Sequence, residues 1–264
     1  MTNTLKIYQV DAFTDHLFGG NPAAVCILNH WLEDQLMQSI AAENNLSETA
    51  FVVPRDGIFE IRWFTPTIEV NLCGHATLAT GHVLFNCLNY REPELIFRSR
   101  KRGDLKVIRQ TDTLFLDFPA DPPQPIGLFS EVEKCIGVKP IEMYRGTTDL
   151  MAVLENEGVV SEIQPDFTEV AKLDARALMV TAKGSQVDFV SRFFAPQSGI
   201  NEDPVTGSAH TVLIPYWSEM LNKEEMRAKQ LSARGGDLIC FHKRDRCLIG
   251  GQTRLYMTGE INIE

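Results

Sequence analysis

The sequence predicts an α/β (α+β) protein of two pseudo-symmetric domains, each a barrel-like, mostly antiparallel or mixed sheet around a central helix. The main observation is an internal repeat, because a shift of 130 residues places Phe59–Pro66 on Phe189–Pro196. Both copies then reach a run of small residues, Gly74–Thr77 in one and Thr206–His210 in the other. A chain of 264 residues also forms two domains of ~130 residues more naturally than one.

In the first half, apolar runs and alternating patterns predict strands at 7–13, 23–28, 49–54, 59–64, 95–98, 105–109 and 114–118. An amphipathic pattern predicts a helix over 31–43 that ends at Asn44-Asn45. The stretch from Gly74 to about Asn89 is apolar nearly all round, and a helix of that kind is buried. The simplest arrangement therefore wraps the strands around this helix.

Four prolines within residues 119–125 predict a linker. It separates domain 1–118 from domain 126–264, although the last strand could pack on the first domain. The second half is predicted to hold a short helix at 130–136, a central helix at 207–221, and strands at 143–144, 151–154, 177–181, 187–194, 238–240, 246–249 and 254–258. Pro215 should kink the central helix or leave one of its carbonyls unpaired.

Composition excludes several functional classes. A net charge of −10 argues against nucleic acid or an anionic membrane as the main partner. No apolar stretch approaches the ~20 residues of a membrane span, and Met1–Lys6 lacks the apolar run of a signal peptide. We therefore expect a cytoplasmic protein with six reduced cysteines. None of them is spaced with cysteine or histidine as in a usual zinc site, so no metal is expected.

Glu48 is the first candidate for chemistry. The segment Asn45–Phe51 places this one carboxylate between a helix end and an apolar strand. A carboxylate at such a junction can be partly desolvated, which suits general acid/base work. A surface glutamate at a strand start is the alternative, and the residues alone favour it.

The two loops that precede the predicted central helices are the second candidate. The 130-residue shift places Cys73 on Asp203, so one loop ends in a thiol and the other in a carboxylate. Free N–H groups at a helix N-terminus can hold an anion such as a carboxylate. His75, in the first turn, is expected to act as a neutral hydrogen-bonding group. The alternatives are a small buried cysteine and an aspartate that only caps its helix, with Glu202 next to it.

Together these segments resemble the PhzF family of phenazine biosynthesis-like proteins, whose fold is related to that of diaminopimelate epimerase. The resemblance spans nearly the whole chain. It rests on six segments in the same order: Val10–Thr14, Gly20–Val25, Asn45–Phe51, Phe64–Pro66, Cys73–Ala79 and Asn201–His210.

The resemblance implies two similar domains with the active site between them, isomerase chemistry without metal, pyridoxal phosphate or other cofactor, and a homodimer. It implies that Glu48 is the main acid/base, which reverses the reading from the residues alone. It further implies that His75, Asp203 and Gly207-Ser208 contact the substrate and that Asn21 lies on a loop facing it. Gly74 and Cys73 complete the expected substrate-binding set.

One departure from the family pattern keeps the chemistry open. The phenazine enzyme does not carry a cysteine where Cys73 stands, whereas the epimerase carries cysteines at both repeat positions. We therefore expect a cofactor-independent isomerase that moves a proton within a small carboxylate-bearing metabolite. The alternatives are an amino-acid racemase or epimerase that uses Cys73 and Asp203, and a binding protein that keeps the fold without turnover.

Overall fold

The computed structural model describes residues 3–101, 103–128 and 130–263. The chain divides into two compact units, one of Met1–Asp117 with Gly250–Glu264 and the other of Phe118–Ile249. Both units are built from strands with a few helices, so the predicted α+β class is confirmed. No helix among the described residues is long and apolar enough to cross a membrane.

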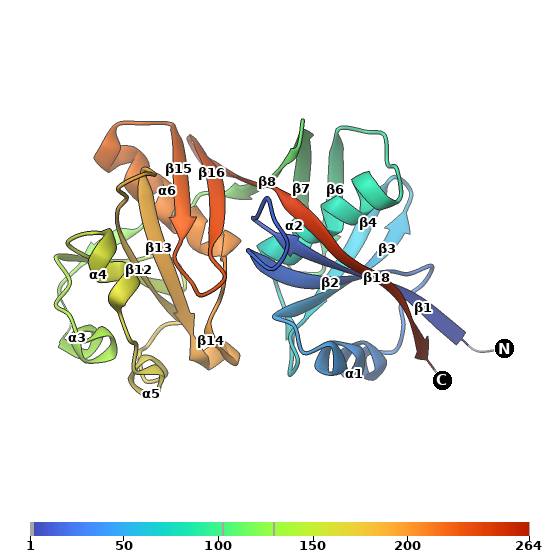
Figure 1. The fold of residues 1–264 in the computed structure, drawn as a ribbon, viewed down its shortest axis with the longest axis horizontal. Helices are drawn as coiled ribbons and strands as arrows, with labels where there is room; N and C mark the ends of the chain where they lie inside the picture. Colours follow the sequence, from blue (N-terminus) through green and yellow to red (C-terminus); the bar gives the residue numbers. More distant parts are fainter. Residues whose placement is uncertain (1–2, 102, 129, 264) are drawn as a thin grey trace. The chain divides into compact units, whose positions relative to one another are not determined.

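The first unit contains a mixed sheet in the order β18-β1-β2-β3-β4-β6-β7-β8 (Figure 1). Two neighbouring pairs, β2–β3 and β4–β6, are parallel, and the others are antiparallel. The strands are β1 (Asn3–Ala12), β2 (Asn21–Ile27), β3 (Glu48–Arg55), β4 (Ile58–Phe64), β6 (Glu94–Ser99), β7 (Gly103–Gln110), β8 (Thr113–Pro119) and β18 (Thr253–Ile263). A short strand, β5 (Glu69–Val70), pairs with the end of β4.

The second unit repeats this order as β9-β10-β11-β12-β13-β15-β16. The pairs β11–β12 and β13–β15 are parallel, at the same places in the order as the parallel pairs of the first unit. The strands are β9 (Gln124–Ile126), β10 (Glu142–Arg145), β11 (Asp149–Val153), β12 (Ala177–Lys183), β13 (Phe189–Ala195), β15 (Glu225–Gln230), β16 (Gly236–Lys243) and β17 (Arg246–Gly251). Strand β14 (Ile200–Glu202) pairs with the end of β13, as β5 does with β4.

Each unit has one central helix, as predicted. In the first unit, every residue of α2 (Gly74–His82) is buried, and a π-helical turn, η1 (Val83–Cys87), continues it. Small residues allow this burial. A Cβ at Gly81 would lie 2.9 Å from Val107 Cγ1, so glycine lets the helix approach β7 closely. In the second unit, α6 (Gly207–Leu221) keeps its helical course through Pro215.

Shorter helices lie outside the sheets. In the first unit, α1 (Asp34–Asn44) starts three residues later than predicted and ends at Asn45, whose φ of 50° is left-handed. Its buried side chains pack with those of β3 and β4. The second unit carries α3 (Ser130–Ile136), α4 (Glu157–Glu162), α5 (Phe167–Val170) and the 3₁₀ turn η2 (Pro196–Ser198).

The observed units differ from the predicted domain limits. Residues 250–264 belong to the first unit, as the alternative placement of the last strand had it, because β18 pairs along β1 from Asn3↔Ile263 to Ala12↔Thr253. The two strands lie side by side in Figure 1. The predicted linker 119–125 contributes residues to β8 and β9, and all of it belongs to the second unit.

Candidate active site

Glu48 lies at the first position of β3, just after the left-handed Asn45 that ends α1. Parallel pairing aligns Glu48 with Ala23 in β2. Strand β3 is central in its sheet, and the residue is only 9% exposed. The junction therefore buries the carboxylate, as the desolvation argument from the sequence requires.

Cys73 and His75 come from the start of α2. Cys73 is the N-cap, with extended backbone angles, and His75 lies in the first turn. The hydroxyl of Thr77 donates to the carbonyl oxygen of Cys73 at 2.5 Å, which fixes this turn. Helix α2 packs against β2 and β3, so the first turn reaches the position where Glu48 begins its strand.

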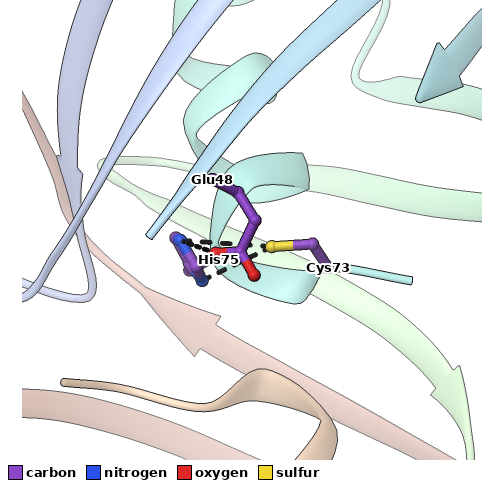
Figure 2. A group of neighbouring side chains, drawn as sticks. All are labelled: Glu48, Cys73 and His75. Atoms are coloured by element: carbon purple, nitrogen blue, oxygen red, sulfur yellow. Dashed lines mark hydrogen bonds and ion pairs between the residues drawn. The ribbon is translucent and has the colours of Figure 1, made fainter. Parts of the chain in front are cut away.

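These three side chains form one buried cluster (Figure 2). The Nε2 atom of His75 lies 3.1 Å from Oε2 of Glu48. The thiol sulfur of Cys73 lies 3.5 Å from Nδ1 and 4.0 Å from Nε2 of the same ring. The cluster thus joins a carboxylate, an imidazole and a thiol, which are all groups that can hold or move a proton.

Asn21 supports the ring from the other side. It is the first residue of β2 and fully buried, and its Nδ2 lies 3.1 Å from Nδ1 of His75. With this amide donating to Nδ1, a neutral imidazole keeps its proton on Nε2. That nitrogen is the one that faces Glu48, so Asn21 selects the tautomer that can donate to the carboxylate.

The carboxylate of Glu48 is not fully satisfied by this contact. Its Oε2 is buried and accepts no well-aligned hydrogen bond from the described residues, although Nε2 of His75 is within ion-pair distance. A buried polar atom without an aligned partner is uncommon in folded proteins, and it requires an explanation. Binding or proton transfer at this oxygen is such an explanation.

Asp203 lies in the second unit, before α6. Its Oδ2 accepts a hydrogen bond of 2.6 Å from the hydroxyl of Thr206. Gln230 ties the loop together, because its amide nitrogen donates to the carbonyl of Asp203 and its amide oxygen accepts from the backbone N–H of Thr206. Asp203 therefore belongs to the loop that shapes the helix start, without being the N-cap itself.

The structure corrects the register of the internal repeat at this loop. Glu202, the neighbour of Phe194 in β14, comes eight positions after it, whereas Glu69, the neighbour of Phe64 in β5, comes five positions after it. The second loop is therefore three positions longer than the first. A constant shift of 130 residues no longer aligns equivalent positions after this loop, so Cys73 and Asp203 are not equivalent.

The N-cap of α6 is Thr206, so Thr206 is the structural counterpart of Cys73. The side chain four residues on supports this match in both helices. His210 Nδ1 donates to the carbonyl of Thr206, as the Thr77 hydroxyl does to that of Cys73. The predicted pairing of a thiol and a carboxylate at equivalent positions is therefore wrong, and the pair is a thiol and a hydroxyl.

Arg62 in β4 and Arg192 in β13 make structural ion pairs at equivalent positions of the two units. Arg62 pairs with Asp34 and Glu69, while Arg192 makes a two-point contact with Glu202. The ion pair gives Glu202 a structural role and so distinguishes it from its neighbour Asp203. The sequence alone could not make this distinction.

Arg176, directly before β12, reaches the start of α6 and is a residue that sequence reasoning missed. Arg176 donates through Nε and Nη2 to the buried Asp149, and Nη2 lies 3.3 Å from the hydroxyl of Ser208. Burial opposes the charged guanidinium, but the hydrogen bonds and charge of Asp149 and the charge of Asp203 raise the pKa of Arg176. A fixed cation thus lies beside Gly207-Ser208. Only its position before a predicted strand could have suggested this role.

The cluster of the first unit also has the composition of a metal site. Glu48, Cys73 and His75 each offer one ligand atom, and these atoms lie within 4.8 Å of one another. The sequence spacing did not show this, because Glu48 is 25 residues from Cys73 along the chain. The sequence predicted no set of metal ligands, whereas the structure brings three possible ligand atoms together.

Comparison with known proteins agrees with this fold. The family model described as phenazine biosynthesis-like protein matches residues 10–259. The chain is 50% identical over 259 residues to an uncharacterized isomerase of Pseudomonas aeruginosa, covering 98% of this chain and 99% of that protein.

Solved structures show the same relationship. A PhzF family phenazine biosynthesis protein of Enterococcus faecalis superposes with a TM-score of 0.96 at 48% identity, covering 99% of this chain and all of the other. A hydroxyproline epimerase of Agrobacterium vitis shares the fold at a TM-score of 0.65, with 10% identity, over 100% of this chain and 94% of the other. The predicted epimerase-like fold is therefore confirmed, and the chain belongs to the phenazine biosynthesis-like (PhzF) family.

Proposed function

We propose that the protein is an isomerase that moves a proton within a small carboxylate-bearing metabolite, with Glu48 as the main acid/base and without a metal or other cofactor. The observation that carries the proposal is the buried Oε2 of Glu48, which lacks an aligned hydrogen bond and lies 3.1 Å from the ring of His75. The relatives support the reaction class, because the similar Pseudomonas aeruginosa protein is named an isomerase.

The proposed reaction begins with Glu48 ionised. Its carboxylate removes a proton from a carbon next to an electron-withdrawing group, and the electron pair of that C–H bond moves onto the group as an enolate-like charge. His75 stabilises this charge by hydrogen bonding. The proton returns to a different atom, which gives an isomer, and Glu48 is again ionised at the end.

The carboxylate of the substrate needs a positive partner. The N–H groups of the first turn of a helix provide one, and the residues proposed for this are Cys73 with Gly74 and Gly207 with Ser208. Arg176, next to Ser208, adds a full positive charge. We propose that residues of both units, Asp203 included, act on the same substrate, and the variants Asp203→Asn and Glu48→Gln should then impair the same reaction.

Deuterium exchange tests the proposal. The wild-type protein is incubated in D2O with a panel of small carboxylic acids, and incorporation of deuterium is followed by NMR. Exchange with a shifted double bond or functional group supports the isomerase. Exchange with inversion at one carbon supports the racemase, and no exchange with any acid of a broad panel supports a binding protein.

The comparison of the two helix starts within this chain argues against the racemase alternative. A racemase of the two-thiol kind needs an acid and a base at equivalent positions, and Thr206, a poor proton carrier, occupies the position equivalent to Cys73.

A cytoplasmic location and a homodimer also stay proposals, and light scattering after gel filtration measures the second directly.

A further inference from the structure

We infer that Glu48, Cys73 and His75 form a binding site for Zn²⁺ and similar thiolate-binding cations, and that a bound ion inhibits the enzyme. The binding itself depends only on the geometry of the cluster. The inhibition rests on the proposed function, because it follows from Glu48 being the acid/base.

The donor atoms have the right chemistry. Thiolate sulfur, imidazole nitrogen and carboxylate oxygen are the three donor types that proteins use for Zn²⁺. Three protein ligands with one open position describe a zinc site that is accessible to water or to an inhibitor. An ionised thiol and a carboxylate together carry two negative charges, which a divalent cation neutralises in a buried place.

The distances require only a small adjustment. Ideal tetrahedral zinc with Zn–S of about 2.3 Å and Zn–N of about 2.05 Å gives an S···N edge of about 3.5 Å and an N···O edge of about 3.3 Å. In the cluster, Cys73 Sγ and His75 Nε2 are 4.0 Å apart, and Nε2 and Glu48 Oε2 are 3.1 Å apart. All three ligand atoms lie within 4.8 Å of one another, so side-chain movements of up to about 1 Å bring them to the ideal edges.

Asn21 provides the supporting contact that such sites use. A metal-bound histidine almost always donates its other ring N–H to a neighbouring acceptor, which fixes the ring. With the ion on Nε2, the proton moves to Nδ1, and Asn21 can turn its carboxamide so that its oxygen accepts there. The 3.1 Å contact between Asn21 and Nδ1 already has the required length.

The second unit explains why only one such site is expected. At the start of α6, Thr206 and Ser208 stand at the positions of Cys73 and His75, because Gly207 matches Gly74 as the first helical residue. Two hydroxyls replace a thiol and an imidazole, and neutral hydroxyls are poor zinc ligands. The repeat thus provides an internal control, and one ion per chain is the expected stoichiometry.

The binding test uses the full-length protein after treatment with EDTA and dialysis. Zn²⁺ is titrated by calorimetry, and Co²⁺ is titrated by absorbance, because a cobalt–thiolate bond gives a charge-transfer band that oxygen and nitrogen ligands do not give. We expect one site per chain and the charge-transfer band. Affinity should fall as pH is lowered, because the thiol must lose its proton to bind.

Cys73→Ser and His75→Gln are the test variants, and Cys87→Ser, which removes a partly buried thiol from the turn that follows α2, is the control. We expect each test variant to weaken Zn²⁺ at least ~100-fold, which is the upper range for losing a supporting contact alone, and the control to bind as wild type. Both test variants must melt cooperatively for the comparison to count. Absence of the cobalt–thiolate band in the wild type, or full Zn²⁺ affinity in either folded test variant, overturns the site.

Inhibition is measured separately. Zn²⁺ should block deuterium exchange with the same affinity as calorimetry gives, and EDTA should restore it. Exchange that continues with the site saturated overturns the inhibition while leaving the binding intact. If the wild type catalyses no exchange at all, the proposed function fails, and the calorimetric result still decides whether the site exists.

Discussion

Acidification should destabilise both units through one buried histidine in each. His82, near the end of α2, has a pKa lowered from 6.5 to about 4 by burial and, to a smaller extent, by the charge of Arg254. His210, in α6, is fully buried, and burial likewise lowers its pKa to about 4, against the opposing effect of its hydrogen bond to Thr206. Its Nε2 has no hydrogen-bond partner among the described residues.

The sign of the effect follows from proton binding. Between pH 6.5 and 4 the unfolded chain binds a proton at each position and the folded chain does not, so the free energy of unfolding falls as pH falls. Above pH 6.5 both states are neutral and the contribution is constant. One pKa unit corresponds to about 1.36 kcal/mol, so each histidine can remove about 3 kcal/mol of stability by pH 4, with a limiting slope of about 1.4 kcal/mol per pH unit.

Urea unfolding at a series of pH values, followed by far-UV circular dichroism, measures this slope. His82→Gln should flatten the dependence for the first unit and leave that of the second. His30→Gln, at an exposed position, is the control and should change nothing. A free energy of unfolding that stays constant between pH 7 and 5, or a slope unaltered by His82→Gln, would show that this histidine does not set the pH dependence.

Three further predictions concern single residues. Arg62→Met should lower the free energy of unfolding by about 2–3 kcal/mol, less than the ~3–5 kcal/mol of a fully buried pair, because its partner Asp34 is 72% exposed and stays hydrated. The control Arg98→Met, at an exposed ion pair, should lower it by under about 1 kcal/mol. Equal losses in the two variants would contradict this expectation. Cys73→Ala should keep most deuterium-exchange activity if the thiol only lines the site, whereas a collapse would make it an acid/base. Arg176→Lys should raise KM about 10–100-fold with a smaller change in kcat, since a two-point charged contact contributes about 1.5–3 kcal/mol; an unchanged KM would remove Arg176 from substrate binding.

Much of the fold could be predicted because its signals are local. The small-residue runs that begin at Gly74 and Gly207 mark both central helices, and most strands follow from apolar runs. The helix boundary at Asn45 was also predictable, because asparagine tolerates the left-handed conformation that ends a helix.

The pairing partners could not be predicted, because pairing is not local. Strand β18 joins the first unit although more than 230 residues separate it from β1. Its exposed and partly polar pattern gives no sign of which sheet it completes. The short strands β5 and β14 were missed for a related reason, since two or three residues carry no period.

The site was predicted in part. Glu48 and His75 are close in space as the family resemblance implied, but their contact depends on the parallel β2–β3 pairing and on how α2 packs against these strands. The match of Cys73 with Asp203 failed because the second loop is longer, and a shift without gaps cannot detect an insertion. Whether Asp203 acts on substrate stays a prediction.

The role of Glu48 is tested by the rate at which Glu48→Gln exchanges deuterium into a substrate, which is found by metabolite depletion from a cell extract or from the acid panel. The substitution keeps size and hydrogen bonding and removes the proton-accepting carboxylate. Glu43→Gln, on the exposed face of α1, is the matched control. We expect a loss of roughly 10²–10⁴ in rate for Glu48→Gln with little change in melting temperature, and wild-type activity for the control. A fully active Glu48→Gln would contradict the assignment of this carboxylate as the acid/base.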